Sequence, residues 1–339
     1  MHLKYQTQKL GFQWPMREPF LFCAHHRDSY PAGDGMLGPA TGLADRDLGS
    51  DFGHPSGWNM YHGEKVPGFP VHPHRGFETV TIVLTGFVDH ADSMGASGRY
   101  GMGDVQWMTA GRGCQHAEMF PLINTEAGNP LELFQVWLNL PARDKFVPPS
   151  YKMLWAEDIP LVTLSGGGDA CTRVRLIAGT LDGYVALTPT PHSWAAKPEH
   201  HVTILLAELD PGAGISLPAV SPTLNRTLYY YRGGTLKIDG EDYAAGNGIE
   251  LPGDSEVQIS NGPVRSYFLL LAAEPIGEQI AKHGPFVMNT REEIATAYND
   301  YQRTHFGGWP WPRRDQVHGA EKRRFASYAD GTREERPAH

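Results

Sequence analysis

The sequence has few cysteines and no long apolar run. Its three cysteines, Cys23, Cys114 and Cys171, are sparse and odd in number, which excludes a disulfide framework and favours a reducing compartment. The apolar run at 267–273 is too short to cross a bilayer. Residues 1–14 lack the apolar core and cleavage site of a secretory signal. We therefore expect a cytoplasmic protein without a membrane segment.

Positive charge is also scarce. Lys and Arg number 29 against 38 Asp and Glu, and the formal net charge is −9. The basic clusters at 313–314 and 322–324 are interrupted by acidic residues, which is typical of a solvated tail. Non-specific nucleic-acid binding needs a basic surface, so we expect no direct nucleic-acid partner. No glycine-rich phosphate loop stands between a strand and a helix, and no serine-triad signature occurs.

Glycine and proline are abundant, and they predict an all-β fold. The 39 Gly and 27 Pro form about a fifth of the chain, against roughly an eighth on average. Turns between short strands account for such an excess. Apolar and β-branched runs predict strands in the first half at 79–85, 105–109 and 131–140. In the second half they predict strands at 172–179, 201–209, 226–231, 235–239, 256–260 and 266–272.

The second half resembles the first, which predicts two related barrels. The corresponding pairs of segments are 79–86 with 227–234, 103–111 with 246–253, and 133–140 with 267–274. We predict a barrel at 1–140, a proline-rich linker at 141–160, a second barrel with a short helix at 161–305, and an extended tail at 306–339. The helix is predicted from a capping box formed by Thr290 and Glu293, followed by apolar residues at helical spacing.

Two pairs of side chains indicate a metal site in the first barrel. Residues two apart on a strand point to the same face, so His72 shares a face with His74, and His116 shares one with Glu118. If both faces point inward, three imidazoles and one carboxylate converge, a set that suits Fe, Zn, Cu or Ni rather than Mg or Ca. Pro73 cannot donate to a strand ladder, which favours a barrel edge where a metal stays open to a small molecule.

The second barrel has no matching set. The repeat places residues 220–222 at the position of the first histidine pair, and Glu256 and Gln258 at that of the second pair. We therefore expect no equivalent metal there.

The chain resembles the pirin family of the cupin superfamily. The runs HPHRGFETV at 72–80 and GDVQWMTAGRG at 103–113 match the two signatures of that family, and GPFVMNT at 284–290 resembles its C-terminal segment. The resemblance covers roughly residues 15–305. It implies a bicupin, with two face-to-face cupin barrels and one mononuclear metal in the N-terminal barrel. It also implies the ligands His72, His74, His116 and Glu118, with Fe(II) favoured and Zn, Cu, Ni, Mn or Co as alternatives.

Three nearby residues have other interpretations. Many cupins place a carboxylate ligand at the position of Glu78, but the resemblance assigns that role to Glu118, so we interpret Glu78 as a supporting residue. Arg75 either steers an anionic substrate or fixes a loop through a carboxylate, and the second role is favoured. Cys114 either senses redox state or is an inert buried thiol, again with the second favoured.

Two functions from different classes remain open. The resemblance suggests a quercetinase-type dioxygenase, a monomer that uses O2 to cleave a flavonol or a related enol-containing aromatic substrate. Glu118 is the candidate catalytic base for the substrate hydroxyl. The alternative is an iron-dependent redox sensor that binds a protein partner. Animal pirins resemble iron-dependent transcriptional co-regulators of this kind.

Overall fold

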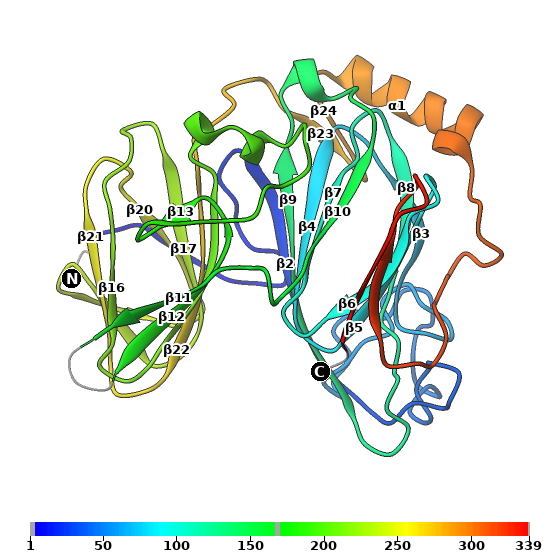
Figure 1. Ribbon diagram of the computed structural model, residues 1–339, viewed down its shortest axis with the longest axis horizontal. Helices are drawn as coiled ribbons and strands as arrows, with labels where there is room; N and C mark the ends of the chain where they lie inside the picture. Colours follow the sequence, from blue (N-terminus) through cyan, green and yellow to red (C-terminus); the bar gives the residue numbers. More distant parts are fainter. Residues whose placement is uncertain (1–3, 167–169, 338–339) are drawn as a thin grey trace. The chain divides into compact units, whose positions relative to one another are not determined.

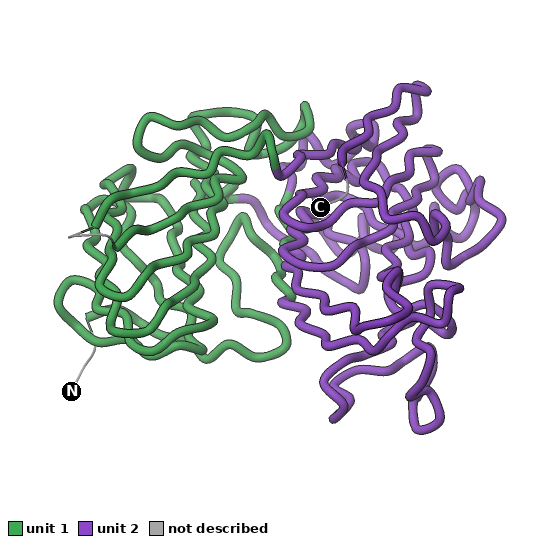
Figure 2. Tube along the Cα trace, turned by 60° about the horizontal axis from the view of Figure 1, so that its bottom comes forward, with its two compact units in different colours: residues 1–24, 136–139, 157–277 green, residues 25–135, 140–156, 278–339 purple. Residues whose placement is uncertain are grey.

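The computed structural model describes residues 4–166 and 170–337, so residues 1–3 of the predicted first barrel, 167–169 of the second barrel and 338–339 of the tail lie outside it. These residues form two compact units, coloured separately in Figure 2. Unit 1 comprises residues 1–24, 136–139 and 157–277. Unit 2 comprises residues 25–135, 140–156 and 278–339, and it contains all four predicted metal ligands.

Unit 2 holds most of the strands of the first half and the C-terminal segment. Its strands, with β2 and β9 shared between the units, are β2 Phe20–Tyr30, β3 Gly68–His74, β4 Phe77–Thr85, β5 Phe87–Asp92, β6 Ser97–Gly101, β7 Val105–Thr109, β8 Cys114–Met119, β9 Asn129–Asn139, β10 Ser150–Leu154, β23 Ala281–His283, β24 Phe286–Met288, β25 Arg324–Ser327 and β26 Arg333–Arg336. Its helices are α1 Arg291–Thr304 and two 3-10 turns at Ala142–Asp144 and His305–Gly307.

Unit 1 holds the strands of the second half and one N-terminal strand. They are β1 Thr7–Lys9, β11 Leu161–Ser165, β12 Cys171–Ala178, β13 Thr180–Leu181, β14 Tyr184–Val185, β15 Thr203–Leu209, β16 Gly214–Leu217, β17 Asn225–Arg232, β18 Thr235–Ile238, β19 Glu241–Ala244, β20 Asn247–Leu251, β21 Val257–Asn261 and β22 Ser266–Ala273. Two 3-10 turns lie at Trp194–Ala196 and Pro198–His200.

The sheets of the two units have the same strand order. One sheet of unit 2 runs β7-β4-β9-β2, and its counterpart in unit 1 runs β20-β17-β22-β15. The second sheets run β6-β5-β8-β3 and β19-β18-β21-β16. This agreement confirms the predicted repeat and the all-β bicupin fold. It also corrects one position, because β16 ends at Leu217, before residues 220–222.

Burial differs between the equivalent strands β8 and β21. Strand β21 alternates between buried and exposed residues, as expected for a strand with one face in water. Every residue of β8 is buried. The outward-facing Gln115 of β8 donates hydrogen bonds to the backbone oxygens of His305 and Gly308, so the turn after α1 covers this face. The strand that carries His116 and Glu118 is therefore enclosed on both sides.

Helix α1 begins at the predicted capping box. Thr290 Oγ1 accepts a hydrogen bond from Glu293 N, and Glu293 Oε2 accepts one from Thr290 N. The buried residues Ile294 and Ala297 pack against Phe286 of β24, so the helix is grouped with unit 2, unlike the predicted boundary at residue 305. Among residues 4–166 and 170–337, no helix is long and apolar enough to cross a membrane.

The C-terminal tail extends the sheet that contains β3 and β8. Strand β25 pairs antiparallel with β6, and β26 pairs with β25, giving the order β26-β25-β6-β5-β8-β3. Among the residues of unit 1 that the structure describes, these two strands have no counterpart. In Figure 1 the tail is the red segment beside β5 and β6. The sequence predicted an extended, solvated tail, whereas the structure contains a hairpin within it.

Candidate metal centre

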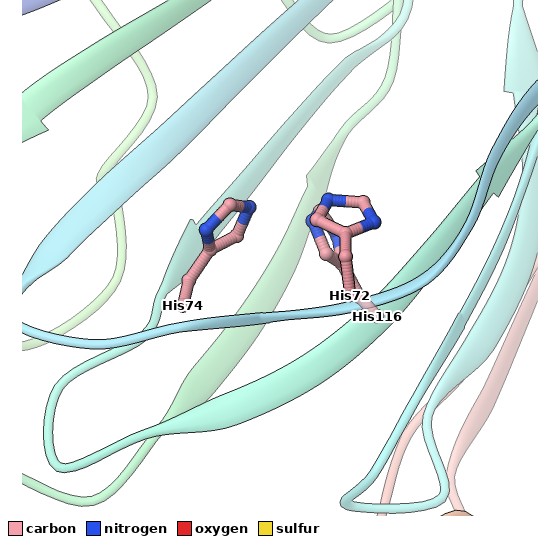
Figure 3. A group of neighbouring side chains, drawn as sticks. All are labelled: His72, His74 and His116. Carbon is pink, nitrogen blue, oxygen red and sulfur yellow. The ribbon is translucent and has the colours of Figure 1, made fainter. Parts of the chain in front are cut away.

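Strands β3 and β8 bring the histidines together. His72 lies directly opposite His116 in an antiparallel pair, and His74 lies opposite Cys114. An irregularity in β3 between Phe69 and His72 shifts the register, so Phe69 lies opposite Glu118. Figure 3 shows the three imidazole rings on one side of the β3 ribbon. The shared face expected from the spacing of two residues is present on both strands.

The three imidazoles are close enough to bind one ion. Their candidate ligand nitrogens all lie within 4.8 Å of one another. The ring centroids are 4.4 Å apart for His72 and His116, and 4.9 Å apart for His74 and His116. His74 and His116 are buried, while His72 is partly exposed. The group therefore has one member on the solvent side.

Burial keeps these imidazoles neutral, which is the form that binds a metal. It lowers the pKa of His72 to about 4 and the pKa values of His74 and His116 well below the usual range. Nδ1 of His72 lies 2.9 Å from the backbone oxygen of Pro70, and Nδ1 of His74 lies 3.4 Å from that of Pro285. Because a carbonyl only accepts, each Nδ1 carries the hydrogen and each Nε2 keeps its lone pair.

His116 supplies the observation that fits a metal best. Its side chain is fully buried, and neither ring nitrogen has a hydrogen-bond partner among the residues described. Nε2 lies 3.7 Å from Oε2 of Glu118, which is too far for a hydrogen bond, and the neutral ring forms no ion pair. A buried polar atom without a partner is costly. A metal ion would satisfy this nitrogen, and the donor set suits a transition metal.

The carboxylate of Glu118 lies beside the histidines and is held from two sides. Thr81 Oγ1 donates to Oε1 over 3.0 Å, and Gln135 Nε2 donates to Oε2 over 2.6 Å. Burial raises the pKa of Glu118 above its ordinary value. The group within 4.8 Å contains the histidines alone, so the ligand role of Glu118 stays a prediction.

The other residues considered from the sequence have structural contacts. Glu78 accepts hydrogen bonds from Trp107 Nε1 and Thr109 Oγ1. Arg75 forms an ion pair of 2.9 Å with Asp300 of α1, in agreement with a loop-fixing role. The buried Cys114 lies with its Sγ 3.8 Å from Met108 Sδ, and burial raises the pKa of its thiol, as expected for an inert cysteine.

Sequence reasoning missed His90 among the neighbours of the site. His90 is fully buried on β5, and its ring centroid lies 5.6 Å from that of His116. Its Nε2 lies 3.2 Å from Oδ2 of Asp92, and its ring stacks on Tyr151. His90 and Asp92 are two residues apart on one strand, the same signal that identified the metal ligands, and β5 pairs with β8 so that Asp92 lies opposite His116.

Comparisons with known proteins place the chain among pirins. A family model described as Pirin matches residues 5–138, and one described as the Pirin C-terminal cupin domain matches residues 204–307. Pirin from Homo sapiens is 39% identical over 261 residues, which cover 74% of this chain and 81% of that protein. A pirin-like protein from Solanum lycopersicum is 39% identical over 247 residues, covering 69% and 75%.

A similar solved structure is that of quercetin 2,3-dioxygenase from Acinetobacter baumannii. It aligns with a TM-score of 0.70 and 26% identity, covering 89% of this chain and 97% of that one.

Proposed function

Because the chain belongs to the pirin family, we propose that it is a metal-dependent oxygenase that cleaves a flavonol or a related enol-containing aromatic with O2. The reaction is the one for which the Acinetobacter baumannii relative is named. The supporting observation is the buried His116, whose two unpartnered nitrogens lie among neutral imidazoles next to a buried carboxylate.

His72, His74 and His116 would hold the metal with Glu118. Fe(II) is the favoured ion, and Zn, Cu, Ni, Mn and Co suit the same donors. When bound there, such an ion supplies a Lewis acid for the substrate enolate and an electronic path to O2. The chain itself supplies the fixed orientation of the imidazoles, through the backbone oxygens of Pro70 and Pro285.

Glu118 would also take the proton of the substrate hydroxyl. Its Oε2 is the oxygen that faces His116, and its raised pKa brings the carboxyl closer to the pH at which it must accept and release a proton. Thr81 and Gln135 hold the carboxylate in place while it does so. An oriented base next to the substrate site is what proton abstraction requires.

The test uses anaerobically purified, iron-loaded protein mixed with quercetin, followed by absorbance loss and oxygen uptake. We expect turnover in the wild type, and loss of metal and turnover together in His74→Ala. His192→Ala is the matched control, because His192 is an exposed histidine of unit 1. Oxygen consumption by a metal-free variant, or no turnover with several metals and flavonols, overturns the proposal.

A regulatory role is the second candidate, favoured by the identity of 39% with human pirin. Here the oxidation state of the bound iron would change the surface offered to a protein partner. Capture of a partner by the ferrous but not the ferric protein, or the reverse, together with absent turnover, would support it.

A further inference from the structure

A cavity of about 600 Å³ lies against His72, the partly exposed member of the histidine group. Its volume is within the range of sites that hold small organic molecules. Because His72 lines it, a molecule bound there lies next to one of the proposed metal ligands. The charged residues that line the cavity are Glu64, Lys65, Arg313, Arg314 and Asp315.

One wall of the cavity comes from the C-terminal tail, and it is held in place. Val71 N, on the free edge of β3, donates a hydrogen bond of 2.8 Å to the backbone oxygen of Arg314. Trp309 Nε1 donates to the backbone oxygen of Arg313, and Trp311 Nε1 donates to that of Asp92, each over 2.7 Å. The matched family regions end at residue 307, so this wall is an addition to them.

The cations of the cavity are not equivalent. Arg313 donates two hydrogen bonds to Asp315, of 3.0 and 2.7 Å, so this pair is neutralised internally. Within the described residues, the side chains of Arg314 and Lys65 have no hydrogen bond or ion pair. Apart from the Arg313–Asp315 pair, the cavity lining therefore carries two cations and one acid, Glu64, on a chain whose formal net charge is −9.

We propose that this cavity binds an aromatic carboxylate, with Arg314 and Lys65 holding the carboxylate group and the aromatic part lying toward His72. The inference rests on the proposed function and narrows its substrate to aromatics that carry a negative charge. An Arg guanidinium matches a carboxylate with two parallel hydrogen bonds, and a rigid backbone around it reduces the entropy lost on binding.

The test is calorimetric titration of the full chain with benzoate and with benzamide, its neutral analogue, in metal-free and zinc-loaded protein. We expect benzoate to bind in both forms, and benzamide to bind about tenfold more weakly. Arg314→Gln should weaken benzoate binding by about tenfold and leave benzamide unchanged. Glu64→Gln should strengthen benzoate binding, because it removes the acid of the cavity that is not paired with Arg313.

Arg303→Gln is the matched control, since Arg303 is an exposed arginine of α1 outside the cavity. Val71 N donates its hydrogen bond to the backbone oxygen of Arg314, so Arg314→Gln leaves this wall of the cavity intact. Equal binding of benzoate and benzamide, binding only in the zinc-loaded form, or no effect of Arg314→Gln overturns the proposal. If benzoate binding depends on Arg314 but the protein consumes no oxygen with any substrate, the anion site stands and the proposed oxygenase function is overturned.

Discussion

Two buried glutamates of unit 2 differ in what surrounds them. Glu118 lies beside His116 and is held by Thr81 and Gln135, whereas Glu78 is held by Trp107 and Thr109. Both are carboxylates of cupin strands, and the sequence alone allowed either to be a ligand. Their contacts make them a matched pair for experiment.

We predict that Glu118→Gln lowers flavonol turnover by at least about a hundredfold, because it removes a proton acceptor and an anionic oxygen at the metal. Glu78→Gln should lower the melting temperature but keep bound metal and most of the turnover. Metal content by plasma mass spectrometry and kcat with quercetin measure the two effects. The reverse pattern would assign the ligand role to Glu78.

The buried Asp28 makes the free energy of unfolding depend on pH, in a direction that follows from its raised pKa. Its buried carboxyl accepts hydrogen bonds from Asn59 and Tyr61, yet desolvation dominates and raises its pKa to about 6. An unfolded aspartate has a pKa of about 3.9. Between these pH values the folded chain keeps a proton on Asp28 that the unfolded chain has released. The stabilisation that results from the raised pKa is therefore complete below about pH 4 and is lost as the pH rises through 6.

We predict that the wild type loses stability relative to Asp28→Asn between pH 4 and pH 7, by at most roughly 3 kcal/mol. Urea unfolding at several pH values measures the difference. Asp45→Asn, which removes an exposed carboxylate, should show no such divergence. Parallel profiles for the wild type and Asp28→Asn would contradict the prediction.

Strand β25 shows how an element can escape sequence analysis. Its residues include the fully buried Arg324, which forms an ion pair of 2.8 Å with the fully buried Asp104. The two are 220 positions apart. A charged tail segment usually lies in solvent, and nothing local in the sequence identifies its partner. Helix α1, in contrast, was predicted because its capping box and apolar spacing are both local.

We predict that Arg324→Met lowers the free energy of unfolding by roughly 3 kcal/mol or more, because Asp104 is left as a buried charge without its partner. Within the described part of the chain, Asp104 would keep the backbone hydrogen bonds from Gly101 and Ala156 alone. The control is Arg333→Met, which removes an exposed ion pair with Glu335 and should cost at most about 1 kcal/mol. Equal urea midpoints for the two variants would show that β25 is not anchored by this pair.

At the scale of the whole molecule, the sequence predicted the fold through its repeat. The three pairs of similar segments correspond to β4 with β17, β7 with β20, and β9 with β22, which are equivalent strands of the two sheets. Strand type and order follow from apolar pattern and turns. Loop lengths do not, which is why residues 220–222 were assigned to a position that β16 occupies.

The sequence predicts those parts of the site that follow from the alternation of side chains along one strand. It does not predict contacts between strands that are far apart in the sequence. His72 and His74, like His116 and Glu118, are two residues apart, so each pair shares a face by geometry alone. The bracing of Glu118 by Gln135 depends on a strand that is adjacent only in the folded molecule. The same holds for the cavity wall at Arg314, which the tail brings to β3.

The sheet that carries the histidines ends on β26, whose sequence is Arg-Glu-Glu-Arg. An outermost strand presents unpaired amide and carbonyl groups that can recruit another chain and start a fibril. Four consecutive charged side chains make such stacking unfavourable, because each copy would have to desolvate them. We therefore expect the tail to limit self-association of the protein, because its loss would leave the backbone hydrogen-bonding groups along one edge of β6 unpaired.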